Sequence, residues 1–309
     1  MLDRFLMEHN ELNTMEPKGE KLRFQPDTIK RANVYARFPV SVPSSYQLFL
    51  TGHVQTHEKI FELHLATTDV PYMIRLTRIE RLLFDTILLH KLMKHFDHDK
   101  ANDRERRSRV VLGCMIQHRM TKLLIDVHPQ ELNLIYLLGR AGGIDQYAWE
   151  TSFVGAASCA RTVCTFLETN QGRVFLPSVF EDCMLGIDLI ILNNKRDNWC
   201  VSVKAGRPNT PLVIEHVHTR PNDEDPAYKS GDRRRIFDGA REMENLYDGA
   251  FRSCRAVVGK TNGNMYDLMV YEADVKHLQH FIDTDRSQPF VRREPFAEAN
   301  QEVTITDAA

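Results

Sequence analysis

Two neighbouring segments of the sequence decide the fold: GIDLIIL at residues 186–192 and WCVSVKA at residues 199–205. Each is an apolar run of strand length that holds one charged residue, Asp188 in the first and Lys204 in the second. An ionised carboxylate inside an apolar strand is costly unless it is paired or binds a metal. Because a polar stretch, residues 193–198, joins the two runs, the sequence predicts a β-hairpin here.

The register of this hairpin predicts which side chains meet. If the turn centres near Lys195 and Arg196, Asp188 lies opposite Lys204. Side chains opposite each other in a hairpin have Cβ atoms about 4.5–5.5 Å apart. Since side chains alternate faces with a period of two, Ser202 shares the face of Lys204. We therefore expect one face of the hairpin to present an acid, a hydroxyl and a lysine.

Outward from the hairpin, the pattern alternates between helix and strand. A helix over residues 146–168 and a strand over 172–177 are predicted before it. A loop over residues 206–230 with four prolines follows, and then a helix over 232–251, strands over 255–260 and 266–271, and a last helix. This order predicts an α/β fold, with a mixed sheet flanked by helices over residues 143–283 and a polar tail over residues 284–309.

Residues 1–142 are expected to form a separate N-terminal domain of short strands followed by helices. After an irregular arm over residues 1–30, β-type runs occur at 34–40, 46–50 and 60–65, with prolines between them. From Thr77 the apolar spacing becomes helical and predicts helices up to about residue 92, over 110–124 and over 130–138, with a charged linker over 95–109. Gly142 and Gly143 mark the boundary. We expect this domain to serve in targeting, dimerisation or docking.

The order of elements over about residues 146–271 resembles that of the PD-(D/E)XK nuclease superfamily, which has a restriction-endonuclease-like fold. In that family a helix with a glutamate precedes a strand, and an aspartate strand and a (D/E)-x-K strand then form a hairpin. The residues that carry the resemblance are Asp188, Lys204 and Glu150, the last as the helix glutamate. Ser202 stands where the family has its second acid, two residues before the lysine.

Three other acids are candidates for that missing carboxylate. Glu181 and Asp182 come just before the aspartate strand, and Glu215 is a weaker candidate in the segment LVIEH at residues 212–216. A polar pair before a strand is also common where it has no catalytic role. The sequence leaves the choice among these acids open.

The resemblance implies a Mg²⁺-dependent endonuclease that hydrolyses DNA phosphodiester bonds, with Mn²⁺ as a substitute. Asp188, a second carboxylate and the backbone carbonyl of Val203 would bind the metal, which would polarise the phosphate and lower the pKa of an attacking water. Lys204 would hold or activate that water and offset charge on the phosphorus. Glu150 would bind the metal directly or through water, and Ser202 would belong to the same catalytic group.

Basic residues near this core are candidates for contacts with a nucleic-acid backbone. They follow the lysine strand or begin the next helix: Arg207, Lys229, Arg233, Arg234 and Arg241. Phosphate contacts position a protein on nucleic acid without reading sequence. DNA is the expected partner and RNA the second, and a homodimer is expected because many nucleases of this type cut both strands by pairing two subunits.

Composition narrows the class of protein. The 309-residue chain has an ordinary globular composition, with 42% hydrophobic and 27% charged residues, and its formal net charge of −2 argues against a non-specific nucleic-acid-coating protein. The six cysteines form no C-x-x-C pair, which argues against a zinc or iron–sulfur knuckle and fits reduced thiols in a cytoplasmic protein. Apolar runs stay below the roughly 18 residues of a membrane span.

Two other interpretations stay open at the level of sequence. The C-terminal half is either a catalytically degenerate nuclease fold that binds nucleic acid or a protein partner, or a structural or assembly protein that shares only the topology. Ser202 and the near-neutral charge favour the first of these. For the individual residues, an ordinary Asp188–Lys204 salt bridge and a helix-dipole role for Glu150 are the simpler alternatives.

Overall fold

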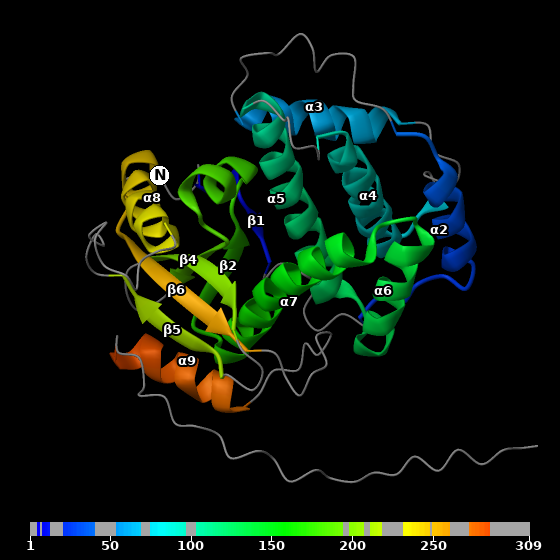
Figure 1. Cartoon of the computed structure of the whole chain (residues 1–309). Helices are drawn as coiled ribbons and strands as arrows, with labels where there is room; N and C mark the ends of the chain where they lie inside the picture. Colours follow the sequence, from blue (N-terminus) through cyan, green and yellow to red (C-terminus); the bar gives the residue numbers. More distant parts are fainter. Residues whose placement is uncertain are drawn as a thin grey trace, which may run out of the picture.

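The computed structural model describes residues 5–6, 8–12, 21–40, 54–68, 75–96, 103–193, 198–206, 211–217, 231–247, 249–259 and 272–284. These residues form a mixed α/β fold around a six-stranded sheet with strand order β1-β2-β3-β4-β6-β5 (Figure 1). The strands are β1 (Asn10–Glu11), β2 (Gly172–Leu176), β3 (Leu189–Asn193), β4 (Asn198–Ala205), β5 (Val213–His216) and β6 (Phe251–Val258). Only β4 and β6 pair in parallel among these neighbours.

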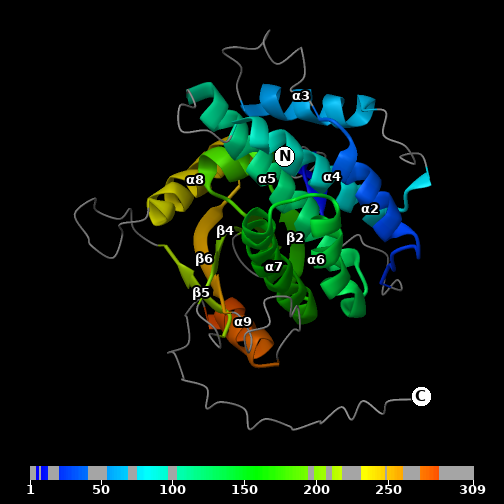
Figure 2. The same ribbon diagram turned by 45° about the vertical axis from the view of Figure 1, so that its right-hand side comes forward.

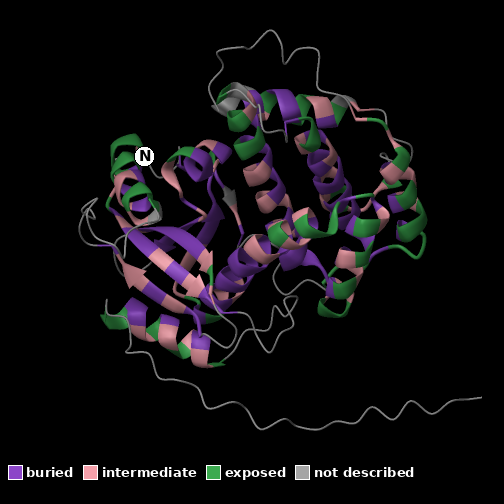
Figure 3. Ribbon diagram, viewed as in Figure 1, coloured by how far each residue is buried: buried purple, intermediate pink, exposed green. Residues whose placement is uncertain are grey.

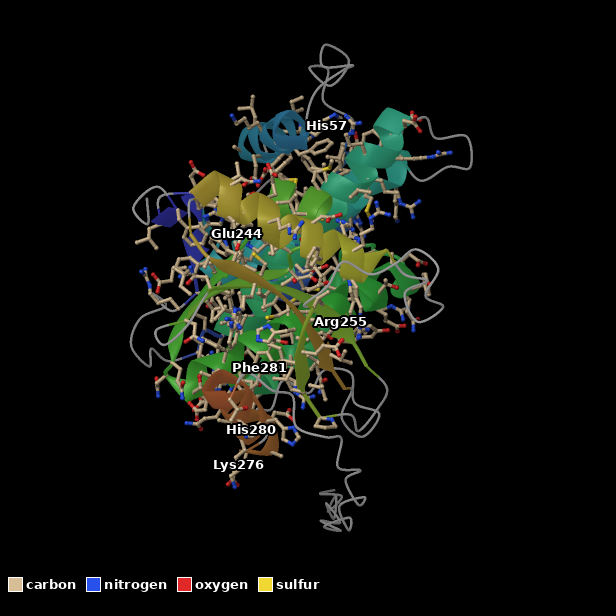
Figure 4. All side chains as sticks on the ribbon, turned by 90° about the vertical axis from the view of Figure 1, so that its left-hand side faces the viewer. His57, Glu244, Arg255, Lys276, His280 and Phe281 are labelled. Atoms are coloured by element: carbon tan, nitrogen blue, oxygen red, sulfur yellow. The ribbon has the colours of Figure 1, made fainter. Side chains whose placement is uncertain are left out.

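The helices lie on both faces of the sheet and beside it. Helices α7 (Gln146–Thr169) and α9 (Glu272–Thr284) pack against one face, and α8 (Asp232–Tyr247) packs against the other. All five residues of β3 are buried, as expected for a strand covered on both faces. In α9, Phe281 points toward the sheet, where it contacts Trp199, while Lys276 points away from it (Figure 4).

Within the described residues, the N-terminal half contributes five further helices. They are α2 (Thr28–Arg37), α3 (Val54–Thr67), α4 (Arg78–Met93), α5 (Asp103–Asp126) and α6 (Leu132–Ala141). Of these, α5 and α6 pack against α7. In Figures 1 and 2, α7 runs between these helices and the sheet, and Figure 3 shows that much of its surface is buried. One cluster of buried apolar residues extends from Leu12 to Ile282 and so joins the two halves of the chain.

The C-terminal half follows the sequence prediction in most of its elements. The predicted helix over 146–168 is α7, which starts after Asp145, whose side chain accepts a hydrogen bond from the Ala148 amide. The helix ends at Asn170, which adopts the left-handed conformation with φ of 53°. The predicted strands over 172–177, 186–193 and 199–205 correspond to β2, β3 and β4, although β3 begins at Leu189 and leaves Asp188 just before it, and the α/β class is confirmed.

The predicted strands of the N-terminal half are wrong where the structure describes them. Residues 34–40 fall largely in α2, and residues 60–65 fall in α3, while residues 46–50 lie outside the described part of the chain. The buried residues of α2 are Thr28, Ala32 and Tyr35, which recur at the helical spacing of three and four. Tyr35, an aromatic residue in one of the predicted strands, therefore lies on the buried face of a helix.

Several boundaries also differ from the prediction. The expected irregular arm over residues 1–30 holds buried Phe5 and Leu12, pairs with β2 through β1, and enters α2 at Thr28. The expected linker over 95–109 already contains the start of α5, and the loop over 206–230 contains β5. The helix predicted over 232–251 ends at Tyr247, and β6 begins at 251 instead of 255.

Other predictions concern residues beyond the described ranges or are left open. The strand over 266–271 and the tail from residue 285 lie outside those ranges. Gly142 and Gly143 do follow the end of α6, with Gly143 in the left-handed region at φ of 79°. Whether they separate two domains stays a prediction. Within the described ranges, no helix is both long and apolar enough to cross a bilayer.

Candidate functional site

The hairpin of β3 and β4 has a register that differs by two residues from the predicted one. Leu189 pairs with Val201, and continuing this register aligns Asp188 with Ser202 instead of Lys204. The prediction that Asp188 faces Lys204 directly is therefore wrong. Because side chains alternate with a period of two, a shift of two residues changes the partner but keeps the face. Lys204 consequently remains on the same side as Ser202.

A small cavity of about 100 Å³ lies where β3 begins. Six residues line it. They come from η5 (the π-helical turn Glu181–Leu185), from the segment just after η5, from β4 and from α8: Asp182, Gly186, Asp188, Ser202, Lys204 and Arg235. Four of these residues were predicted from the sequence as site residues. Their convergence at one end of the sheet makes this cavity the candidate site.

The carboxylate of Asp188 is held by three donors. Its Oδ2 atom accepts hydrogen bonds from the Val203 amide at 2.7 Å and from the Ser202 hydroxyl at 3.3 Å, and its Oδ1 accepts one from Gln117 Nε2 at 3.2 Å. Burial, followed by the charge of Asp182, raises the pKa of Asp188 to about 6, while Lys204 and the hydrogen bonds act in the opposite direction. Hydrogen bonds thus hold Asp188 in position, while its surroundings disfavour its ionised form.

Asp182 is the second carboxylate at the cavity. It stands on η5, and its Oδ2 accepts a hydrogen bond from His118 Nε2 at 2.9 Å. Arg235 of α8 donates to the backbone carbonyl of Asp182 at 2.8 Å, which ties η5 to α8. Gly186 ends the turn in the left-handed conformation, with φ of 70°, and packs under the Arg235 side chain. The turn therefore presents Asp182 beside Asp188.

Sequence reasoning missed three residues of this site. Gln117 and His118 come from α5 in the N-terminal half, and Arg235 comes from α8. The signal for the first two was present, since a polar pair interrupts the apolar helix over residues 110–124. Arg235 is the third of three consecutive arginines, and the sequence analysis names only the first two, Arg233 and Arg234, as candidate phosphate contacts.

Glu150 does not join the cavity. It lies in the first turns of α7, where its carboxylate accepts hydrogen bonds from Tyr136 at 2.9 Å and Gln146 at 2.8 Å. The α7 residue near Asp188 is Cys159, which accepts a hydrogen bond from Gln117, and whose thiol pKa is raised by burial and by Asp188. Nine residues of helix, about 13 Å, separate the two positions. The structure therefore corrects the predicted placement of Glu150 with the metal-binding carboxylates.

Glu181 also lies elsewhere, although it is next to Asp182 in sequence. It is buried, and its carboxylate accepts hydrogen bonds from the Ser178 amide at 2.7 Å, from His9 Nε2 at 2.8 Å and from Tyr247 at 3.2 Å. These partners link η5 to the N-terminal segment and to α8. Of the two acids before β3, Asp182 is the one that reaches the cavity.

Glu215 and the predicted phosphate-binding residues are engaged in other contacts. Glu215 of β5 pairs with Arg233 and, at 3.3 Å, with Arg255. Arg234 lies 3.8 Å from Asp238 in the next turn of α8, and the Arg241 guanidinium stacks 4.8 Å above the Phe237 ring. Arg207 and Lys229 lie outside the described residues.

The two carboxylates fit a cation that needs few protein ligands. No group of three or more His, Cys, Asp or Glu side chains suited to a metal occurs in the described residues. Magnesium is usually held by one or two carboxylates, with water and substrate phosphate completing the shell. Asp182 and Asp188 meet this need, because the charge of Asp182 disfavours the ionised form of Asp188 and a cation held by the two would offset this.

The cavity therefore combines two acids, a lysine and an arginine at the end of a buried sheet. This combination suits the recognition of a charged phosphate ester better than that of an apolar ligand. Comparison of the chain with protein-family models, with characterised proteins and with solved structures finds no match.

Proposed function

We propose that this protein is a Mg²⁺-dependent endonuclease that hydrolyses DNA phosphodiester bonds, with a restriction-endonuclease-like core in its C-terminal half. The observation that carries the proposal is the convergence of Asp182, Asp188 and Lys204 on one cavity. Two acids can hold a metal ion that activates water, and a lysine can offset the charge that develops on the phosphate.

Each residue of the cavity has a role in this reaction. Asp188 and Asp182 would hold Mg²⁺, which supplies a Lewis acid for the phosphate and lowers the pKa of a bound water when present. Lys204 orients the attacking water and offsets the negative charge that develops on the phosphate oxygens. The lysine is suited to this because it stands at the end of β4, on the side of the sheet that carries the two acids.

The residues around the acids act as positioning groups. Gln117 and the Val203 amide fix the orientation of Asp188, and His118 fixes that of Asp182. Asp182 supplies the second carboxylate that Ser202 lacks, while the Ser202 hydroxyl donates to Asp188. The metal would thus be held by one carboxylate just before β3 and one on η5, instead of by two carboxylates of the hairpin.

DNA is the proposed substrate and RNA the second one to test. Arg235 is the second basic residue at the cavity, beside Lys204, and would contact the phosphate next to the scissile one. Pairing of two subunits, which would place two such sites on one duplex, remains part of the proposal and is tested by the oligomeric state in solution.

A second candidate is a degenerate nuclease fold that binds nucleic acid or protein without cleavage. It is favoured by the hydrogen bonds that already satisfy the acids: Asp188 accepts from Val203, Ser202 and Gln117, and Asp182 accepts from His118. The acceptor atoms of carboxylates held in this way are satisfied without a metal.

Cleavage assays with supercoiled DNA, linear DNA and RNA, with Mg²⁺ or Mn²⁺, separate these candidates. We expect the wild-type protein to cut, and Asp188→Asn, Asp182→Asn and Lys204→Met each to lose about 100-fold or more in rate. Glu150→Gln is the matched control, because Glu150 is a carboxylate outside the cavity, and it should keep the wild-type rate. Equal rates for all variants would refute the site, and no cleavage of any substrate by the wild type would favour the degenerate fold.

A further inference from the structure

A second cavity, of about 520 Å³, lies on the other side of the His118–Asp182 pair. Its walls come from α3, α4, α5 and the segment of residues 177–179 that leads into η5. The volume is in the range of small-molecule binding sites, roughly 300–1,000 Å³. Unlike most such sites, this cavity is lined largely by charged side chains, among them Arg78, Arg119 and Lys122.

Four acids also line this cavity, Glu8, Glu58, Glu62 and Asp85, and two of them pair with Arg119. Arg119 donates to Glu62 at 2.6 Å and lies 3.5 Å from Asp85, and its side chain is only 15% exposed. Arg78 lies 3.2 Å from Asp126 at the solvent-facing side, where the arginine side chain is 61% exposed. Each guanidinium has five N–H donors, so these contacts leave donors available for a ligand.

Lys122 is the third of these cations. It lies one turn after Arg119 on α5, is half-buried and lines the cavity. Among the described residues its ammonium group has no hydrogen bond or salt bridge. Burial, followed by the charges of Arg119 and Arg78, lowers the pKa of Lys122, and the smaller opposing effects of Glu62 and Asp126 do not offset this. An ammonium group in this position is stabilised by an anion.

We propose that this cavity binds a phosphate monoester, with Lys122 as the central donor and Arg78 and Arg119 beside it. A phosphate group has several acceptor oxygens and up to two negative charges, which match three cationic donors better than a single carboxylate does. The ester is the terminal phosphate of a nucleic-acid strand or that of a free nucleotide.

The position of the cavity links it to the candidate site. His118 lines the larger cavity and donates to Asp182, which lines the smaller one, so these two side chains form the wall between the cavities. An anion bound at Lys122 would change the electrostatic environment of the His118 imidazole, which orients Asp182. This link to cleavage rests on the function proposed above, whereas binding of the phosphate does not.

Calorimetric titration with pyrophosphate in metal-free buffer tests the binding. We expect the wild type to bind, Lys122→Met to weaken binding about tenfold or more, and Lys122→Arg to retain it. Lys59→Met is the matched control, because Lys59 is an exposed lysine on α3 outside the cavity, and it should bind within about twofold of the wild type. No binding by the wild type, or equal affinities for wild type and Lys122→Met, would overturn the proposal.

Competition experiments identify the source of the phosphate. Displacement of pyrophosphate by a 5′-mononucleotide but not by an oligonucleotide assigns the site to a free nucleotide. Displacement by a 5′-phosphorylated oligonucleotide, and not by its 5′-hydroxyl form, assigns it to a strand end. Displacement by neither contradicts a phosphate monoester. Asp188→Asn should bind pyrophosphate like the wild type, so failure of the nuclease proposal and failure of this one are distinguishable.

Discussion

At the scale of single residues, the fold holds the carboxylate of Asp188 in place and at the same time disfavours its ionised form. Three donors fix the carboxylate, yet burial and the neighbouring Asp182 raise its pKa from 3.8 to about 6. A group whose environment works against its charged form in this way is typical of functional sites.

The raised pKa of Asp188 predicts how stability changes with pH. Because the folded-state pKa lies above the unfolded-state value, the favourable contribution of the protonated group is fully present below pH 3.8 and is lost as pH rises through about 6. Ionised Asp188 then costs the folded state on the order of 3 kcal/mol. Asp188→Asn is therefore expected to be more stable than the wild type at pH 7.5 in metal-free buffer.

Denaturant unfolding between pH 4 and pH 8 measures this difference. The advantage of Asp188→Asn in free energy of unfolding should shrink steadily as the pH falls through 6, because wild-type Asp188 then takes up its proton. A difference in free energy of unfolding that stays constant over the whole pH range would show that the pKa of Asp188 is not raised.

Sequence alone could identify Asp188 and Lys204, because each is a single charge in an apolar run of strand length. It could not identify Gln117 as a partner of Asp188, since 71 positions separate the two residues along the chain. The two-residue error in register has a local cause. The assumed centre of the turn was inferred from polarity, whereas the register follows from the pairing of apolar residues such as Leu189 with Val201.

At the scale of elements, the turn η5 points its two adjacent acids, Glu181 and Asp182, in different directions. Glu181 faces His9 and Tyr247, and Asp182 faces His118 and the cavity. Turns of the π type occur often at functional sites. The sequence before β3 showed that both acids were candidates but not which one reached the cavity, because that choice depends on a turn type without a clear sequence signature.

The packing of α5 against η5 predicts a specific cross-link. Cys114 Sγ on α5 and Cys183 Sγ on η5 are 3.2 Å apart, and both thiols are reduced. We expect the thiol oxidant diamide to join them as a disulfide, with two protons and two electrons passing to the diamide. The Cys183 contact and burial raise the pKa of Cys114, so the reaction should be slow at neutral pH and faster at pH 9.

Peptide mapping of the oxidised protein by mass spectrometry checks this cross-link. The linked peptide pair should disappear in Cys114→Ser and persist in Cys164→Ser, which changes a cysteine elsewhere in the chain, on α7. Preferential linkage of any other pair would mean that α5 and η5 do not pack as described.

At the scale of the whole molecule, the candidate site depends on both halves of the chain. The acids belong to the C-terminal half, but Gln117 and His118, which hold them, belong to α5. Sequence patterns predicted the C-terminal elements well, because strands buried on both faces read as continuous apolar runs. They could not predict that the N-terminal helices share a core with those strands, since packing between distant segments leaves no local pattern.

The contact between Gly139 and Trp149 offers a test of this shared core. Gly139 is on α6, Trp149 is on α7, and the predicted boundary at residues 142–143 lies between them. A Cβ atom on Gly139 would lie 2.1 Å from Trp149 Cε2, whereas a Cβ on Gly113 of α5 would meet no atom within 4 Å. Both are helical glycines, so the same substitution isolates the effect of the collision.

We expect Gly139→Ala to lower the free energy of unfolding by roughly 1–3 kcal/mol, because alanine overfills the contact. Gly113→Ala should raise it by about 0.5–1 kcal/mol through helix propensity. Because the buried cluster runs through both halves, helical and sheet signals in circular dichroism and tryptophan fluorescence should shift together in Gly139→Ala. Separate transitions, with only one displaced, would instead show that residues 1–142 unfold as an independent domain.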